Sequence, residues 1–246
     1  QISFFKSRYR IVAYEREDCG RSVTINFQPA YSNSAEDIAL LVSKLGIHSH
    51  VIIGHSRGQE IAAVYYSRNP PGLKGFVAEG TGICVSPSSQ TVKEAITEIS
   101  KYRSGKINPR LSCFNGIQKH KEVLTKGLAM SNDQVTELMK YSCARWKPAP
   151  GIMGGTDIDI STKLKLISIP MLQIDGADYR KDRDRRQTMQ NYYKNGRLHL
   201  IQKSGHIPHL EDSSEFNRLL SDFLKEIGFY AQDAIKKDEA EIPKKQ

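Results

Sequence analysis

The 246-residue sequence has no apolar run approaching 18 residues, the length that a transmembrane helix needs. Its four cysteines form no C-x-x-C pair, and no spacing of cysteines and histidines fits a zinc site. These absences predict no stable membrane insertion and no bound metal. They also favour a reducing compartment, so we predict a cytoplasmic location.

Basic segments with interleaved aromatic residues are missing too, although the formal net charge is +9. Positive residues gather only at Arg180–Arg186 and Lys236–Lys245, and acidic residues interrupt both runs. Such runs are typical of a solvated surface. We therefore predict that the protein binds no nucleic acid.

The sequence does contain short apolar segments that alternate with helical stretches, a pattern that predicts an α/β fold. Ser34 is expected to open one helix and Gly46 to end it. Further helices are predicted at Gly58–Arg68 and Leu210–Ile227. Strands are predicted at Arg10–Glu15, Val51–Gly54, Lys74–Glu79, Pro170–Gly176 and Arg197–Gln202.

The alternation stops for about 80 residues in the middle of the chain, where the pattern becomes helical. We expect residues 86–164 to form a helical cap inserted into a core of residues 1–85 and 165–232. Ser131 and Gln134 are spaced as a capping box at the start of one cap helix. The charged residues 233–246 are expected to be a disordered tail.

The segment VIIGHSRG, residues 51–58, places G-x-S-x-G between a predicted strand and a predicted helix. In that context the motif indicates a tight, strained turn that exposes Ser56 as a nucleophile. Gly54 and Gly58 are expected to be glycine because side chains there would collide with the neighbouring strand and helix. The side chain of His55, inside the turn, is expected to point away from the site.

A serine nucleophile needs a base, and His206 is the first candidate. It follows the last predicted strand, so it lies at the same sheet edge as Ser56, with His209 as the rival. The base in turn needs an acid to orient it. Asp178 is favoured, and Glu79, at the end of a strand, is the alternative.

Two more acids lie close to Asp178. We expect Asp175, within its strand, to be a sheet or turn residue, and Asp182, in a charged run, to be solvated.

The order Ser…Asp…His, the elbow GHSRG, the loop GADY and the segment SGHIPHLED together resemble the α/β-hydrolase superfamily. The similarity is to its serine-nucleophile, capped, esterase- or lipase-like members.

This resemblance implies a mostly parallel sheet with flanking helices and a helical cap. It implies Ser56 as nucleophile, His206 as base and Asp178 as acid, with the Arg57 backbone N–H in the oxyanion hole. Glu79 stands where some family members carry the acid. No metal or organic cofactor is implied, and the partner is a small acyl substrate.

The sequence also departs from the family. The acid loop Gly176–Asp178 is one residue shorter than the usual G-x-x-D. Family members begin with two or three more strands, the last of which leads to a second oxyanion donor. We therefore expect that this sequence is a fragment, or that another segment fills the place of the missing strand. Without that strand, Arg10–Glu15 and Val51–Gly54 have no direct partner. One lost oxyanion donor costs about 10²–10³ in rate.

The predicted function is a serine hydrolase that cleaves carboxylic esters or related acyl compounds through an acyl-enzyme. Hydrolysis of a C–C bond and cofactor-free perhydrolysis would use the same residues. From a different class, the alternative is a non-catalytic or truncated ligand-binding protein on the same scaffold.

Overall fold

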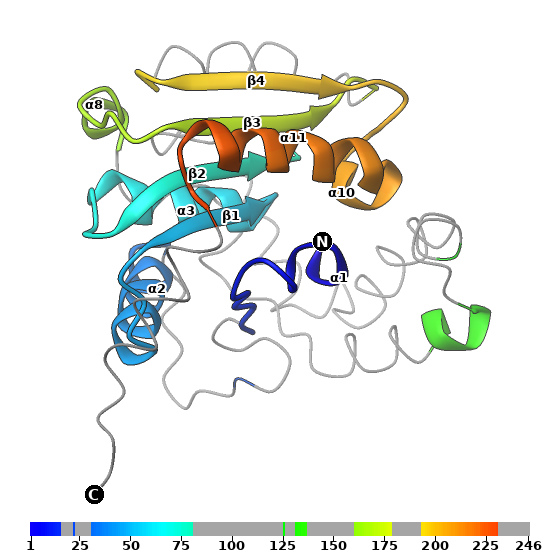
Figure 1. The fold of residues 1–246 in the computed structure, drawn as a ribbon, viewed down its shortest axis with the longest axis horizontal. Helices are drawn as coiled ribbons and strands as arrows, with labels where there is room; N and C mark the ends of the chain where they lie inside the picture. Colours follow the sequence, from blue (N-terminus) through cyan, green and yellow to red (C-terminus); the bar gives the residue numbers. More distant parts are fainter. Residues whose placement is uncertain are drawn as a thin grey trace, which may run out of the picture.

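Four parallel strands form the sheet, in the order β1 (His50–His55), β2 (Leu73–Glu79), β3 (Met171–Gly176) and β4 (Gly196–Ile201). This computed structural model describes residues 1–15, 22, 31–80, 125, 131–136, 160–178 and 193–230. All strands run the same way, so their carboxyl ends meet at one edge (Figure 1). The predicted α/β fold class is confirmed.

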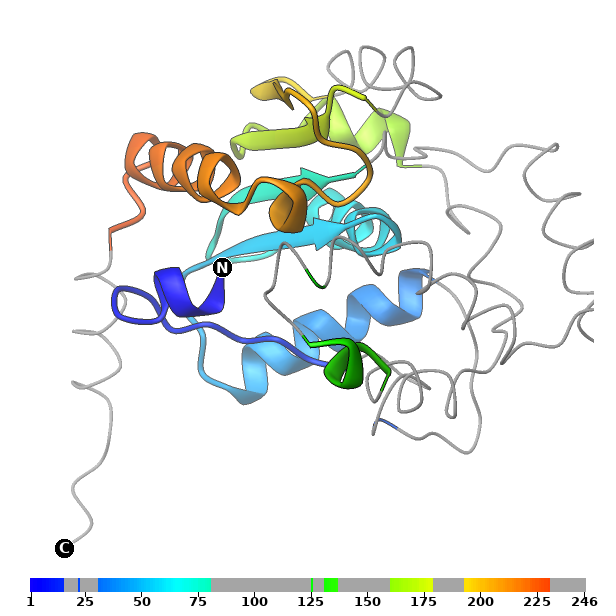
Figure 2. The ribbon, with the colours of Figure 1, turned by 90° about the vertical axis from the view of Figure 1, so that its right-hand side faces the viewer.

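Helices cover both faces of this sheet (Figure 2). One face packs against α2 (Tyr31–Lys44), α3 (Arg57–Ser67) and the short α8 (Ser161–Leu164). The other packs against α1 (Ile2–Phe5) and α11 (Ser213–Glu226), which follows α10 (Pro208–Glu211). The core therefore has two apolar layers with the sheet between them.

Alternation along β2 separates the two layers. Phe76 and Ala78 lie in the cluster with α3, whereas Val77 lies in the cluster with α11. All six residues of β3 are buried. Continuous burial of this kind is typical of a parallel strand that is covered on both faces.

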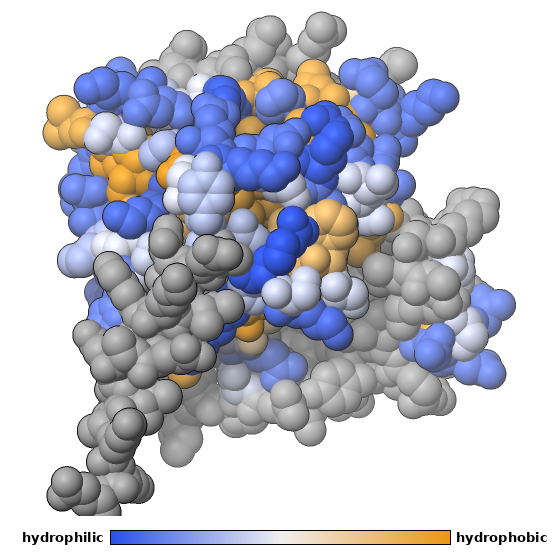
Figure 3. All heavy atoms as spheres, viewed as in Figure 1, coloured by the Kyte–Doolittle hydropathy of each residue, from blue (hydrophilic) through white to orange (hydrophobic). Residues whose placement is uncertain are grey.

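The outer face of α11 is solvated, and the surface over this helix is mostly hydrophilic (Figure 3). Arg218 pairs there with Glu215 at 2.6 Å and with Asp222 at 2.9 Å. Phe216 and Leu220 face the opposite way and are buried. None of the helices in the described ranges has both the length and the apolar character that crossing a bilayer requires.

The strand predictions are confirmed at four of five positions. The segment Arg10–Glu15 was predicted as a strand, but it forms no regular element and its residues are exposed. Within the described residues no strand lies beside β1 on its outer side, and Ile53 in β1 is 49 % exposed. The prediction was wrong because a strand needs a partner for its backbone groups.

Helix boundaries differ from the predictions in two places. α2 begins at Tyr31, ahead of the predicted Ser34, although Gly46 ends it with φ +61° as expected. The predicted single helix Leu210–Ile227 is divided at Asp212, whose side chain accepts a hydrogen bond from the Glu215 N–H and so caps α11.

Most of the predicted cap lies outside the described residues, as does the predicted tail. The capping box is described and confirmed. The Ser131 Oγ accepts a hydrogen bond from the Gln134 N–H at 3.1 Å, and the Gln134 Oε1 accepts one from the Ser131 N–H at 2.8 Å.

Tyr66 joins α3 to the chain that enters β3. Its hydroxyl donates to the Ile169 carbonyl at 2.6 Å, and its ring packs against Phe76 and Tyr193. Burial raises the pKa of Tyr66. The phenol therefore stays protonated and remains a donor.

Replacing Tyr66 with Phe is expected to lower the free energy of unfolding by about 1–2 kcal/mol, because the partly buried Ile169 carbonyl loses its donor. Urea unfolding followed by circular dichroism measures this. The matched control is Tyr230→Phe at a side chain that is 54 % exposed, with an expected change below about 0.5 kcal/mol. Equal destabilisation by the two substitutions would contradict a stabilising hydrogen bond between Tyr66 and the Ile169 carbonyl.

Candidate active site

Ser56 occupies a strained turn between β1 and α3. Its φ of 51° and ψ of −119° lie in a region that side-chain-bearing residues rarely adopt, at a cost of about 1–3 kcal/mol. The Ser56 N–H donates to the Glu79 carbonyl at 2.8 Å, which ties the turn to the end of β2. Arg57 opens α3, so its backbone N–H lies at the positive end of the helix dipole.

The two glycines of the motif differ in their surroundings. A Cβ atom on Gly54 would lie 2.5 Å from the Gly58 carbonyl oxygen and 2.6 Å from the Gln59 Cα. The predicted collision is therefore confirmed for Gly54. For Gly58 it is wrong, since a Cβ there meets no described atom within 4 Å. Among the described atoms, steric contacts therefore require glycine at Gly54, at the end of β1, but not at Gly58.

His206 lies in contact with Ser56. The distance from its Nε2 to the Ser56 Oγ is 3.2 Å, and its Nδ1 lies 3.1 Å from the Gly80 carbonyl oxygen. A carbonyl oxygen can only accept, so Nδ1 carries the proton. In the neutral ring, Nε2 then has the lone pair that accepts from the Ser56 hydroxyl.

The two candidate acids lie in different environments. Asp178 is exposed, and its backbone N–H donates to the Ser204 carbonyl at 2.9 Å. This bond keeps the Asp178 loop beside the loop that carries His206. Glu79 is only 2 % exposed, and its carboxylate is bonded to His209 rather than to His206.

Asp175 is the acid that the hydrogen bonds connect to the site. It is fully buried, and its Oδ1 accepts from the Gly80 N–H at 3.0 Å. Its Oδ2 accepts from the Gln173 Nε2 at 3.0 Å. Asp175 thus fixes the position of Gly80, whose carbonyl contacts His206. Its interpretation as a sheet or turn residue is confirmed, but this link to His206 is not visible in the sequence.

Glu211 holds the loop that carries His206 through hydrogen bonds to Ser204 and Gly205. The Glu211 Oε2 accepts from the Ser204 Oγ at 2.7 Å and also from the Gly205 N–H. A Cβ atom on Gly176 would lie 2.1 Å from the Gly205 carbonyl oxygen. The end of β3 therefore approaches this loop as closely as glycine allows.

His55 lies beside His206, although its position in the turn predicted that it would point away. The two ring centroids are 5.0 Å apart, and the His55 Nε2–H donates to the His206 carbonyl at 2.9 Å. Burial lowers the pKa of His55, and the charge of Glu79 opposes part of that shift. The prediction failed because it considered only the local turn.

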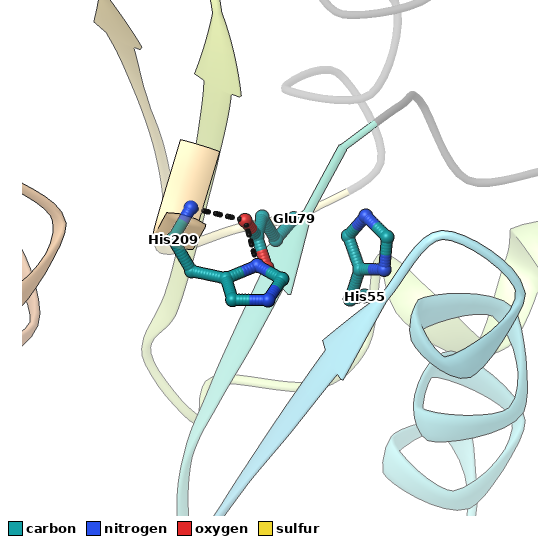
Figure 4. A group of neighbouring side chains, drawn as sticks. All are labelled: His55, Glu79 and His209. Carbon is teal, nitrogen blue, oxygen red and sulfur yellow. Dashed lines mark hydrogen bonds and ion pairs between the residues drawn. The ribbon is translucent and has the colours of Figure 1, made fainter. Parts of the chain in front are cut away.

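Three of these side chains gather at the carboxyl edge of the sheet (Figure 4). His55 comes from the end of β1, Glu79 from the end of β2 and His209 from α10. One ligand atom from each lies within 4.8 Å of the other two, an arrangement that could hold a metal ion. No sequence pattern indicated this cluster, because its members are far apart along the chain.

Comparison with known proteins identifies the fold. Residues 2–105 match the family described as alpha/beta hydrolase fold. The chain is 23 % identical over 244 residues to the proline iminopeptidase of Heyndrickxia coagulans, covering 88 % of this chain and 82 % of that protein. A thermophilic esterase from Thermogutta terrifontis has a TM-score of 0.67 at 19 % identity, covering 86 % of this chain and 78 % of that one.

The chain has the α/β-hydrolase fold. Another relative is the bifunctional esterase/perhydrolase DCH of Acinetobacter calcoaceticus. It is 36 % identical over 69 residues, which cover 28 % of this chain and 25 % of that protein. The family match and the named relatives support a hydrolase of this fold, and they support the predicted membership of the α/β-hydrolase superfamily.

The turn geometry predicts opposite effects for two glycine substitutions. Gly54→Ala is expected to destabilise the α/β hydrolase by about 1–3 kcal/mol or more, because backbone atoms of α3 must move. Gly58→Ala is its matched control, expected to be neutral or stabilising by up to about 1 kcal/mol because alanine favours the helix. Thermal and urea unfolding measure both. If Gly54→Ala unfolds at the same temperature and urea concentration as the wild type, the close approach of Gly54 to α3 is contradicted.

Proposed function

We propose that this protein is a serine hydrolase of carboxylic esters or related acyl compounds, with Ser56 as nucleophile and His206 as general base. The observation that carries the proposal is the 3.2 Å contact between the Ser56 Oγ and the His206 Nε2. It occurs at a positive-φ turn that opens a helix, the context in which G-x-S-x-G exposes a reactive serine.

In the first half of the reaction, His206 takes the Ser56 proton on Nε2 as Oγ bonds to the acyl carbon. The electron pair of the carbonyl bond moves to its oxygen, which the Arg57 N–H stabilises. The tetrahedral species collapses, and His206 gives its proton to the departing alkoxide. The products are an alcohol and an acyl-Ser56 ester.

In the second half, water replaces the alcohol. His206 takes a proton from the water as its oxygen attacks the acyl carbon, and then returns that proton to the Ser56 Oγ. A carboxylic acid leaves. Relatives named iminopeptidase and esterase/perhydrolase favour chemistry at an acyl carbon. Perhydrolysis would differ only in that hydrogen peroxide takes the place of water.

For the acid, we propose Asp178. Its place between Ser56 and His206 in the chain follows the resemblance, and its backbone bond to Ser204 keeps it beside the His206 loop. The Gly80 carbonyl accepts the Nδ1–H in the resting state. The role proposed for Asp178 is to stabilise the imidazolium once it forms.

Labelling with a fluorophosphonate probe is expected to modify Ser56, since this side chain has a base in hydrogen-bond contact. Mass spectrometry of the labelled peptide identifies the site. Ser56→Ala should abolish labelling, and His206→Gln should slow it by about 10²-fold or more. His199→Ala, at an exposed histidine of β4, is the matched control. A folded wild-type protein that is not labelled would contradict the proposal.

Asp178→Ala is expected to slow labelling of Ser56 by about 10- to 10⁴-fold, because the imidazolium loses its negative partner. The rate of fluorophosphonate labelling measures the effect. Asp133→Ala, in the 132–136 helix, is the control for removal of an exposed acid. If Asp178→Ala reacts at the wild-type rate, the acid assignment is wrong. The Gly80 carbonyl fixed by Asp175 would then be the group that orients His206.

A further inference from the structure

The cluster of His55, Glu79 and His209 is not used by the proposed reaction. Its ring and carboxylate atoms lie at the carboxyl ends of β1 and β2 and at the start of α10 (Figure 4). The ring centroids of His55 and His209 are 5.2 Å apart. The three side chains therefore share one small space at the carboxyl edge of the sheet.

The donor atoms in this space are those that first-row divalent metals prefer. Imidazole nitrogen suits zinc, cobalt and nickel, and a carboxylate oxygen joins two histidines in many zinc sites. Three protein ligands of this kind leave the fourth position to water. His209 is 23 % exposed, so the space is open to solvent on its side.

The distances are within reach of such a site. With bonds of 2.0–2.1 Å, tetrahedral ligand atoms lie about 3.3 Å apart. The His209 Nδ1 and Glu79 Oε1 are 2.6 Å apart and must separate by about 0.7 Å. The widest separation in the cluster, up to 4.8 Å, must shorten by about 1.5 Å. Zinc binding therefore requires side-chain rotations that move these atoms by up to about 1.5 Å.

Burial of Glu79 favours a cation. The side chain is only 2 % exposed, and a buried carboxylate is costly unless an opposite charge lies close to it. The Glu79 carboxylate accepts from the ring Nδ1–H and the backbone N–H of His209. A divalent ion would supply a full countercharge at the same oxygens.

Hydrogen bonds to backbone groups already orient two of these side chains. The His55 Nε2 lies 2.9 Å from the His206 carbonyl oxygen, and the Glu79 Oε1 is 2.8 Å from the His209 backbone nitrogen. Contacts of this type to backbone groups are what hold metal-binding side chains in place. Backbone contacts therefore hold His55 and Glu79 in place, and the His209 ring is bonded in turn to Glu79.

We propose that His55, Glu79 and His209 bind one zinc ion that links the ends of β1, β2 and α10. On binding, zinc takes the place of the proton between the His209 Nδ1 and the Glu79 carboxylate, and the neutral ring of His209 then carries its proton on Nε2 after exchange through solvent. Because the ion binds the folded state, it stabilises that state by linkage. The sequence predicted no bound metal, because these three ligands are far apart along the chain and form no closely spaced motif.

Zinc titration of the full chain, free of any histidine tag, tests the proposal. Equilibrium dialysis should find one saturable zinc per chain, and zinc should raise the Tm by several degrees. His55→Asn and His209→Asn should each weaken binding at least tenfold and abolish the rise in Tm. The matched control is His199→Asn, at an exposed histidine, which should bind as the wild type does.

Two results would overturn the proposal. One is the absence of saturable binding by the wild type, and the other is equal binding by the three histidine variants, which would indicate adventitious surface sites. If a ligand variant fails to fold, NMR of the wild type decides. Zinc must then perturb the imidazole signals of His55 and His209 and leave that of His199 unchanged.

The zinc site does not depend on the proposed hydrolase function. Ser56→Ala should therefore bind zinc as the wild type does. A wild-type protein that binds zinc but is not labelled by the fluorophosphonate would contradict only the hydrolase. A wild-type protein that is labelled but binds no zinc would contradict only the metal site.

Discussion

The turn at the end of β2 is the structural element on which the site depends. The peptide group between Glu79 and Gly80 makes two hydrogen bonds, because its carbonyl accepts from the Ser56 N–H and its N–H donates to the Asp175 Oδ1. The next carbonyl, that of Gly80, accepts from the His206 Nδ1–H. Three segments far apart in the sequence are thus positioned by two consecutive residues.

Backbone conformation at this turn explains why glycine follows Glu79. Gly80 has φ +99°, where a side chain is strained, and a Cβ there would lie 3.0 Å from the His206 carbonyl oxygen. The parallel register supports the same arrangement, since His55 pairs with Glu79 across β1 and β2. The strained Ser56 is stable because buried groups on the neighbouring strands hold its backbone.

Local patterns in the sequence were sufficient for part of this result. Strand–turn–helix order around Ser56 and the four described strands follow from hydrophobic periodicity and glycine placement. The segment Arg10–Glu15 has the same apolar pattern but forms no strand, since pairing depends on a neighbour that the pattern does not reveal. Likewise, the contact of His55 with His206 and the link from Asp175 to Gly80 join separate loops, and no local signal encodes them.

The most direct test of this arrangement is the tautomer of His206. Long-range ¹H–¹⁵N correlation spectra of the labelled protein at about pH 8, where imidazoles are largely neutral, distinguish the two ring nitrogens. The hydrogen bonds predict a protonated Nδ1, bonded to Gly80, and an unprotonated Nε2 that faces Ser56. A proton found on Nε2 would contradict both the role of the Glu79–Gly80 turn and the activation of Ser56.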